Sequence, residues 1–159
     1  VLLAMGHQEI GYLTPPIIND HYSYADRCLG YRQAMEVAGL KTHVVEHGRI
    51  PGSQLRQAVC ELVKANANLT AWLSYSDTVA VHICHVLEQM GHVVGETHHV
   101  STVGAAISLQ LQYLEHYPIL HTPHIWETVG QQAVELLLKK IKNPKTRQTS
   151  KAVHVPYQL

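Results

Sequence analysis

The sequence predicts an α/β protein whose mostly parallel sheet is flanked by helices on both faces. Short runs rich in β-branched and aromatic residues alternate with longer runs whose apolar residues recur every three or four positions. The connections between these runs are only a few residues long, which is typical of strand–helix–strand units in a parallel sheet. The chain has 159 residues, 46% of them apolar and 15% charged, so it can bury a core of its own.

The first strand is expected at residues 9–14 (EIGYLT), because the two prolines that follow cannot continue a strand. Residues 24–38 are expected to form a helix, with apolar positions such as Met35 among polar ones. Gly39 comes next and supplies the left-handed conformation that commonly ends a helix. The second strand is expected at residues 42–45, which completes one strand–helix–strand unit.

A second unit follows the first. Ser53 is expected to cap a helix over residues 53–65, whose apolar residues lie on one face. Residues 69–75 (LTAWLSY) have the composition of a buried strand. Asp77 is expected to cap the next helix, residues 77–90, whose apolar residues are spaced by three and four.

The last third of the chain predicts two more strands and a long helix. Residues 100–104 (VSTVG) are expected to form a strand, and residues 105–117 fit either a loop or a short helix. A Thr-Pro pair at 122–123 is a typical helix start, and the helix is expected to reach residue 141. Residues 152–157 are expected to form the final strand.

The composition argues against several classes of function. Twelve basic and twelve acidic side chains give no net charge, which disfavours direct binding of this chain to nucleic acid. The longest apolar stretches, such as residues 133–138, are far shorter than the roughly 20 residues of a membrane helix. The three cysteines have no CxxC pair, which indicates reduced thiols in the cytoplasm. No GxSxG, GxxxxGK or GxGxxG motif is present, so we expect neither an enzyme nor a cofactor.

Five blocks of the sequence carry a family resemblance. They are GHQEIGYL from Gly6, DRCLGYRQAMEVAGL from Asp26, SDTVAVHICHVLEQMGHVV from Ser76, HHVSTVG from His98 and ETVGQQAVELLLKKI from Glu127. In this order they resemble blocks of the LacI/GalR family of bacterial transcriptional regulators. Together the blocks span most of the chain, from Gly6 to Ile141.

The resemblance implies a periplasmic-binding-protein-like fold of type I, with two subdomains that enclose a small-molecule effector. By this resemblance, residues 14–121 and 153–159 form the C-terminal subdomain, and residues 1–13 and 122–152 form part of the N-terminal one. The helix-turn-helix that precedes the sensor in this family is not in this sequence, so DNA would be bound only through that other domain. The expected function is cytoplasmic sensing of a sugar-like effector by a homodimer. An exported solute-binding protein of the same fold is the alternative, and a signal peptide upstream would favour it.

Arg27, Ser76 and Asp77 are the first candidates for effector binding. Ligands in parallel sheets bind at the carboxyl ends of the strands, where residues 14–26, 74–78 and 104–108 form loops. Arg27 occupies the effector-binding arginine position of the family, although a surface ion pair with a neighbouring carboxylate would also explain it. Ser76 stands where relatives present Asn or Ser to the ligand, while Asp77 is expected to act mainly as the helix cap.

Four further candidates come from the last third of the chain. By resemblance, His124 and Trp126 face the cleft, Trp126 as an aromatic platform or, equally well, as a core anchor; His121 is a weaker candidate. Ala106 stands where many relatives carry a sugar-binding Asp, with Ile107 beside it. Because this apolar pair cannot accept hydrogen bonds, the effector is either not a typical free sugar or is no longer bound.

Two pairs of histidines are candidate metal ligands. His82 and His85 are three residues apart on one expected helix, and His98 and His99 follow one strand later. Helical zinc pairs are normally four residues apart and have a third ligand, and no HExxH motif occurs here. We therefore expect no metal site, and we expect histidines whose titration influences stability between about pH 5 and 7.

Overall fold

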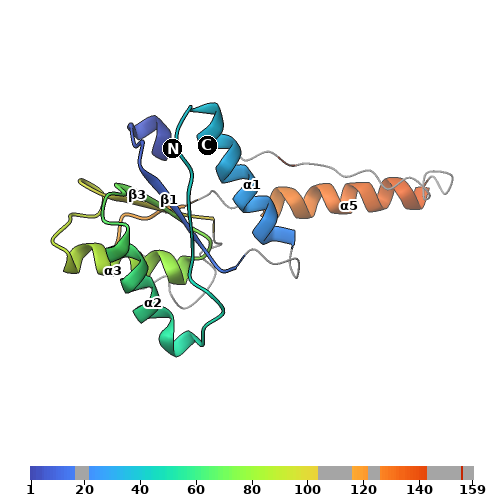
Figure 1. Ribbon diagram of the computed structural model, residues 1–159. Helices are drawn as coiled ribbons and strands as arrows, with labels where there is room; N and C mark the ends of the chain where they lie inside the picture. The colour runs from blue at the N-terminus through green and yellow to red at the C-terminus, as the bar shows by residue number, and fades with distance from the viewer. Residues whose placement is uncertain (17–21, 104–115, 122–125, 143–154, 156–159) are drawn as a thin grey trace. The chain divides into compact units, whose positions relative to one another are not determined.

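The computed structural model describes residues 1–16, 22–103, 116–121, 126–142 and 155, and divides the chain into two compact units (Figure 1). Unit 1 is Val1–His121 and unit 2 is Thr122–Leu159. The described part of unit 1 contains a short 3-10 helix, five strands and three helices in an alternating order. These are η1 (Leu2–Met5), β1 (Ile10–Thr14), α1 (Tyr22–Val37), β2 (His43–Glu46), α2 (Gly52–Ala65), β3 (Ala71–Ser74), α3 (Asp77–Gln89), β4 (His99–Thr102) and β5 (Leu120–His121). The described part of unit 2 is mainly one helix, α5 (Trp126–Lys142).

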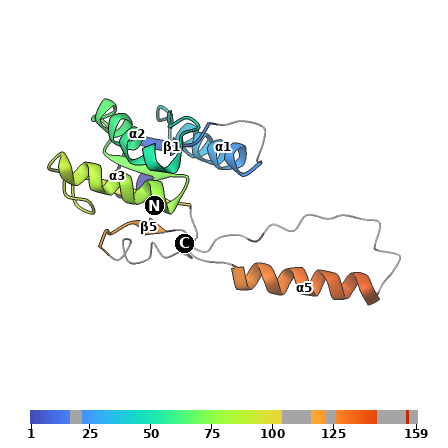
Figure 2. The same cartoon turned by 90° about the horizontal axis from the view of Figure 1, so that it is seen from below.

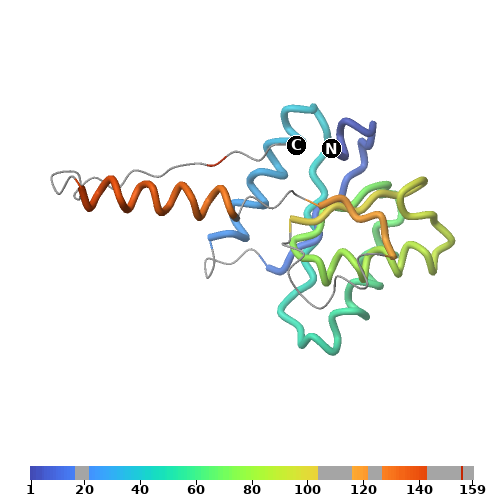
Figure 3. Tube along the Cα trace, turned by 180° about the vertical axis from the view of Figure 1, so that it is seen from behind, coloured from blue at the N-terminus to red at the C-terminus, as the bar shows by residue number. Residues whose placement is uncertain are grey.

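The five strands form one sheet in the order β2-β1-β3-β4-β5, and every neighbouring pair is parallel. Gly11 of β1 is in register with His43 of β2 and Trp72 of β3, and Trp72 is in register with Val100 of β4. Figure 3 shows β5 beside β4, from which it continues the sheet. The predicted α/β fold with a parallel sheet is therefore confirmed.

Helices cover both faces of the sheet. Leu13 and Trp72 pack into a buried cluster with α2 and α3, which lie side by side in Figures 1 and 2. Ile10 and Tyr12 belong to a second cluster, in which α1 is the covering helix. Because successive residues of a strand point to opposite faces, these alternating memberships place α1 on one face and α2 and α3 on the other. All five residues of β1 are buried, as expected of a central parallel strand.

β1 ties the first residues of the chain to the rest of unit 1. The structure keeps residues 1–13 in one compact unit with residues 14–121. The reason is that Leu13 is fully buried and β1 has hydrogen-bonded neighbours on both edges. The second compact unit begins at Thr122.

Two predicted helix caps were wrong. α2 begins at Gly52 after Pro51, and no side chain caps it, so Ser53 is not its cap. Ser76, one residue before the predicted Asp77, is the cap of α3, and its Oγ accepts a hydrogen bond from the Val79 amide at 3.4 Å. Gly39 does adopt a left-handed conformation after α1, with φ +67°, as predicted. The expected strand 152–157, the expected start of α5 and most of residues 105–117 lie outside the described residues.

Candidate functional site

The carboxyl ends of β1, β3 and β4 meet at one edge of the sheet, and backbone hydrogen bonds join the loops that leave them. The amide of Tyr75 donates to Leu13 O at 3.0 Å, and the amide of Val103 donates to Ser74 O at 3.2 Å. The amide of His47, which follows β2, donates to Thr14 O at 3.0 Å. This edge is where parallel α/β sheets bind ligands.

Arg27, the leading sequence candidate, reaches this edge from α1. Its Nη1 donates a hydrogen bond to the backbone oxygen of Tyr75 at 3.0 Å. Its Cζ lies 4.4 Å from the centroid of the Tyr75 ring, which is a cation–π contact. Within the described ranges, no carboxylate forms an ion pair with Arg27, so the surface ion pair considered as its alternative role is not seen there. Of the five N–H donors of a guanidinium, the bond to Tyr75 uses only one.

Two further residues of α1 hold Tyr75 in place. The Ser23 hydroxyl lies 3.1 Å from the Tyr75 hydroxyl. The Tyr24 ring packs on the Tyr75 ring, with centroids 4.6 Å apart and planes inclined by 44°. Burial and the neighbouring Tyr75 raise the pKa of Tyr24, while the charges of Arg27 and Arg49 act in the opposite direction. We call Ser23, Tyr24, Arg27 and Tyr75 the arginine–tyrosine cluster.

Two buried hydroxyls lie on the same side of the sheet as this cluster. Tyr12 and Thr14 are both fully buried, and they alternate with residues of the opposite face. The Thr14 hydroxyl is close enough to Tyr12 to act on its pKa, in the lowering direction. Neither hydroxyl has a hydrogen-bond partner of good geometry among the described residues. Burial raises the pKa of Tyr12, and the charge of Arg27 opposes that rise, so Tyr12 lies within electrostatic reach of the cluster.

Ser76 and Asp77 have structural roles at this edge. The carboxylate of Asp77 is 8% exposed and accepts a hydrogen bond from the Thr102 hydroxyl at 3.0 Å, which ties α3 to β4. The Ser76 hydroxyl caps α3, and the Ser76 backbone oxygen accepts a bond from Ser74 Oγ at 2.8 Å. The hydroxyl of Ser76 and the carboxylate of Asp77 are therefore already engaged within the fold.

The remaining sequence candidates fall in three places. His121 ends β5, is exposed, and pairs in register with Thr102, so it lies at the same edge of the sheet. Ala106 and His124 lie outside the described residues. Trp126 is the first residue of α5, but its side chain is not described.

Sequence reasoning missed Tyr75, Tyr24 and Ser23. Tyr75 directly follows β3 and lies within the 74–78 loop expected at the carboxyl edge, so its place in that loop could have identified it. Tyr24 is three residues before Arg27 on α1, a spacing that places both on one helical face. The two buried hydroxyls of β1 had no separate signal, because Tyr and Thr are common in strands.

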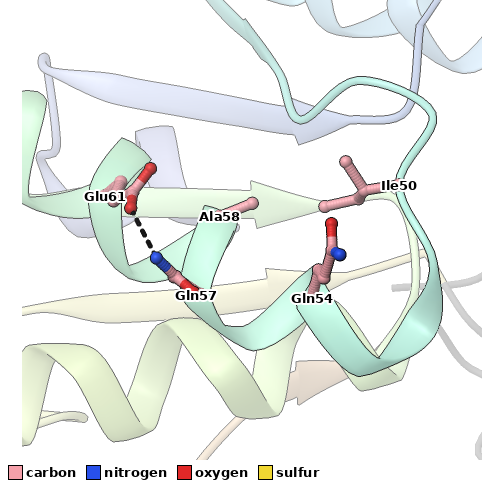
Figure 4. Close-up of a pocket in the computed structure, with 5 residues that line it drawn as sticks. All are labelled: Ile50, Gln54, Gln57, Ala58 and Glu61. Carbon is pink, nitrogen blue, oxygen red and sulfur yellow. Dashed lines mark hydrogen bonds between the residues drawn. The ribbon is translucent and has the colours of Figure 1, made fainter.

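A shallow hollow of about 250 Å³ lies along α2, away from these residues (Figure 4). It is lined by Ile50, Gln54, Gln57, Ala58 and Glu61. Gln57 donates to Glu61 at 3.1 Å, so these two polar side chains of the lining bond to each other. It combines no cation with an aromatic face, and we do not assign it a function.

No three His, Cys, Asp or Glu side chains in the described part of the chain are grouped so as to hold a metal ion. None of the described helices has the length and apolar character needed to span a membrane.

Comparison with known proteins agrees with the fold. A family model described as a periplasmic binding protein-like domain matches residues 1–159. The chain is 32% identical over 152 residues to the HTH-type transcriptional regulator GalR of Escherichia coli K12, an alignment that covers 89% of the chain and 40% of GalR.

Solved structures show the same fold. A LacI-family regulatory protein from Chloroflexus aggregans matches 89% of the chain and 50% of its own, with a TM-score of 0.67 and 22% identity. A LacI-family transcriptional regulator from Enterococcus faecium with bound ribose matches 99% of the chain and 57% of its own, with a TM-score of 0.63 and 21% identity. The chain thus spans 40% to 57% of the length of these three proteins. The chain belongs to the periplasmic binding protein-like domain family, and it is similar to the LacI/GalR regulators of that family.

Proposed function

We propose that this chain is the effector-sensing part of a LacI/GalR-type transcriptional regulator, and that a sugar-like small molecule binds at the arginine–tyrosine cluster. The observation that carries the proposal is the Arg27 guanidinium, held by Tyr75 at the ligand-binding edge of the sheet. Guanidinium donors suit sugar oxygens, and aromatic rings suit the apolar face of a sugar. The ribose in the E. faecium regulator supports this class of ligand.

The effector would act by shifting the population of two arrangements of the subdomains. In this proposal unit 1 is one subdomain, residues 122–152 belong to the other, and His121, His124 and Trp126 lie near the crossover between them. With Ala106 where many relatives carry a sugar-binding Asp, the effector site would lack that carboxylate acceptor. DNA would be bound by a separate domain, and the regulator would act as a cytoplasmic homodimer without catalytic activity.

Similarity to GalR supports a regulator over an exported solute carrier of the same fold. The upstream sequence distinguishes the two: a helix-turn-helix supports the regulator, and a signal peptide supports the carrier. For the dimer, we propose a contact through α3 and residues 109–113. Sedimentation of the purified protein tests the dimer directly.

The binding site is tested by a thermal-shift screen of the purified protein against sugars, sugar acids and nucleosides, followed by calorimetry on each hit. Replacing Arg27 with Ala should weaken the binding of a hit about tenfold or more, because it removes charge-assisted hydrogen bonds. The matched control is Arg32→Ala, because Arg32 lies on the same helix but donates to Cys28 Sγ at 3.4 Å. Equal binding by wild type and Arg27→Ala would show that the site is wrongly placed.

A further inference from the structure

The arginine–tyrosine cluster carries positive charge that the described carboxylates do not neutralise. Arg27 forms no ion pair with any described carboxylate. The Arg27 guanidinium lies against the Tyr75 ring, and the Tyr24 ring packs on the Tyr75 ring as well. A guanidinium without a carboxylate partner among the described residues, beside the packed rings of Tyr24 and Tyr75, has a stronger electrostatic preference than a neutral sugar requires.

None of the nearby carboxylates that the structure describes forms an ion pair with Arg27. Asp77 accepts a hydrogen bond from Thr102 in the interior. Glu46, at the end of β2, acts electrostatically on Arg32, which lies more than one turn beyond Arg27 on α1. Asp26 is exposed on α1. The sequence from 104 to 117, which follows β4, contains one acidic residue, Glu115.

The buried hydroxyls of β1 add donors on the same side of the sheet. Thr14 and Tyr12 are fully buried, and their hydroxyls have no well-formed hydrogen bond to a described residue. A buried hydroxyl without a partner costs free energy, which a ligand oxygen can recover. Hydroxyl donors beside a guanidinium favour an acceptor-only group such as a carboxylate or a phosphate.

We propose that the effector of this site is an acidic sugar derivative, whose carboxylate or phosphate binds Arg27 while its ring packs on Tyr24 or Tyr75. This inference rests on the proposed function and specifies its ligand class. The planar fork of a guanidinium binds such oxyanions through two parallel hydrogen bonds. A neutral sugar would leave that charge without a counterion in a site from which water is displaced.

The test is calorimetric titration of the purified protein, at low ionic strength, with matched sets of probes. The sets are galactose, galacturonate and galactose 6-phosphate; glucose, glucuronate and glucose 6-phosphate; and ribose with ribose 5-phosphate. Inorganic phosphate is titrated alone to detect a simple anion site. We expect at least one acidic member to bind ~10-fold or more tightly than its neutral parent and than inorganic phosphate. Comparison of the affinities of the uronates with those of the sugar phosphates shows which oxyanion is preferred.

Variants assign the preference to Arg27. Arg27→Gln should remove most of the advantage of the acidic probe and change the binding of the neutral parent less. Arg32→Gln, the matched control, should leave both affinities within about twofold. A neutral parent that binds as tightly as its acidic partners overturns this inference and leaves the proposed function standing. If no sugar of either kind binds, or if inorganic phosphate binds as tightly as the sugar phosphates, the proposed function fails as well.

Discussion

The Arg27 guanidinium lies over the Tyr75 ring at 4.4 Å and donates to the Tyr75 backbone oxygen at 3.0 Å. These residues are 48 positions apart in the sequence, and the packing of α1 on the face of the sheet brings them together. The contact fixes the cation at the carboxyl edge of the sheet. Ser23, Tyr24 and Arg27 all contact Tyr75, so Tyr75 links the residues of the site.

Replacing Tyr75 should show how much the ring contributes. Tyr75→Leu removes the cation–π contact and the bond to Ser23, and we expect it to weaken ligand binding by about 1–2 kcal/mol. Tyr75→Phe keeps the ring and loses only the hydroxyl, so its effect should be smaller. Calorimetry with the best ligand measures both. Equal losses for Leu and Phe would mean that the hydroxyl, and not the ring, positions Arg27.

The buried bond from Thr102 to Asp77 should contribute to stability. Asp77→Ala leaves the Thr102 hydroxyl without this partner and should lower the free energy of unfolding by about 1–3 kcal/mol. Thr102→Val should cost a similar amount, and the double variant less than the sum, because both remove one interaction. Urea unfolding measures all three. Asp26→Ala, at an exposed position, is the control and should change stability by less than about 0.5 kcal/mol.

Two glycine substitutions should have opposite effects. A Cβ at Gly11 would lie 2.7 Å from Leu69 Cδ1 and 2.9 Å from the Trp72 ring, so Gly11→Ala should destabilise the protein by about 1–3 kcal/mol. Gly30 lies in α1 with nothing within 4 Å of an added Cβ, so Gly30→Ala should stabilise it by up to about 1 kcal/mol. Thermal unfolding checks both. A neutral Gly11→Ala would mean that the Trp72 ring can move.

Histidines near the start of β4 should make stability depend on pH. Burial, with the neighbouring histidines, lowers the pKa of His7 and His98 below 6.5. His7 Nε2 lies 2.9 Å from His99 Nδ1, and the rings of His92 and His98 are 3.8 Å apart. The unfolded chain thus takes up more protons than the folded one below pH 6.5, and the free energy of unfolding falls as pH decreases through this value.

This pH dependence is measured by urea unfolding between pH 7.5 and 5. His98→Gln should make the loss of stability on acidification smaller, because one histidine with a lowered pKa is removed. His116→Gln, at an exposed position, is the control and should leave the slope unchanged. If the free energy of unfolding of His98→Gln depended on pH as steeply as that of the wild type, His98 would not be a source of the pH dependence.

Most of the fold could be predicted because its signals are local. α1 was predicted from apolar residues such as Met35 among polar ones and from Gly39 as its end. Met35 is buried with Cys28 and Tyr31, at spacings of three and four. β5 was not predicted, because a strand of two residues is too short to show alternation. The choice between Ser76 and Asp77 as cap also escaped prediction. Both residue types cap helices, and the bond from distant Thr102 draws Asp77 into the interior.

The candidate site was predicted only in part. The resemblance singled out Arg27, but no local pattern identifies Tyr75 as its partner, since the packing of α1 on the sheet brings these distant residues together. The packing of residues 1–13 with the rest of unit 1 could not be predicted for a related reason. The edge partners of a strand are not encoded in the strand, and β1 lies between β2 and β3.

Hydrogen exchange with and without the best ligand, read by mass spectrometry, tests whether the ligand binds at the arginine–tyrosine cluster. Binding there should slow exchange in peptides that contain residues 22–28 and 74–78, where α1 and the end of β3 form the cluster. Exchange in peptides from α2 that line the hollow at Gln54 and Glu61 should not change. Protection confined to α2, with none around Arg27 and Tyr75, would show that the ligand binds elsewhere.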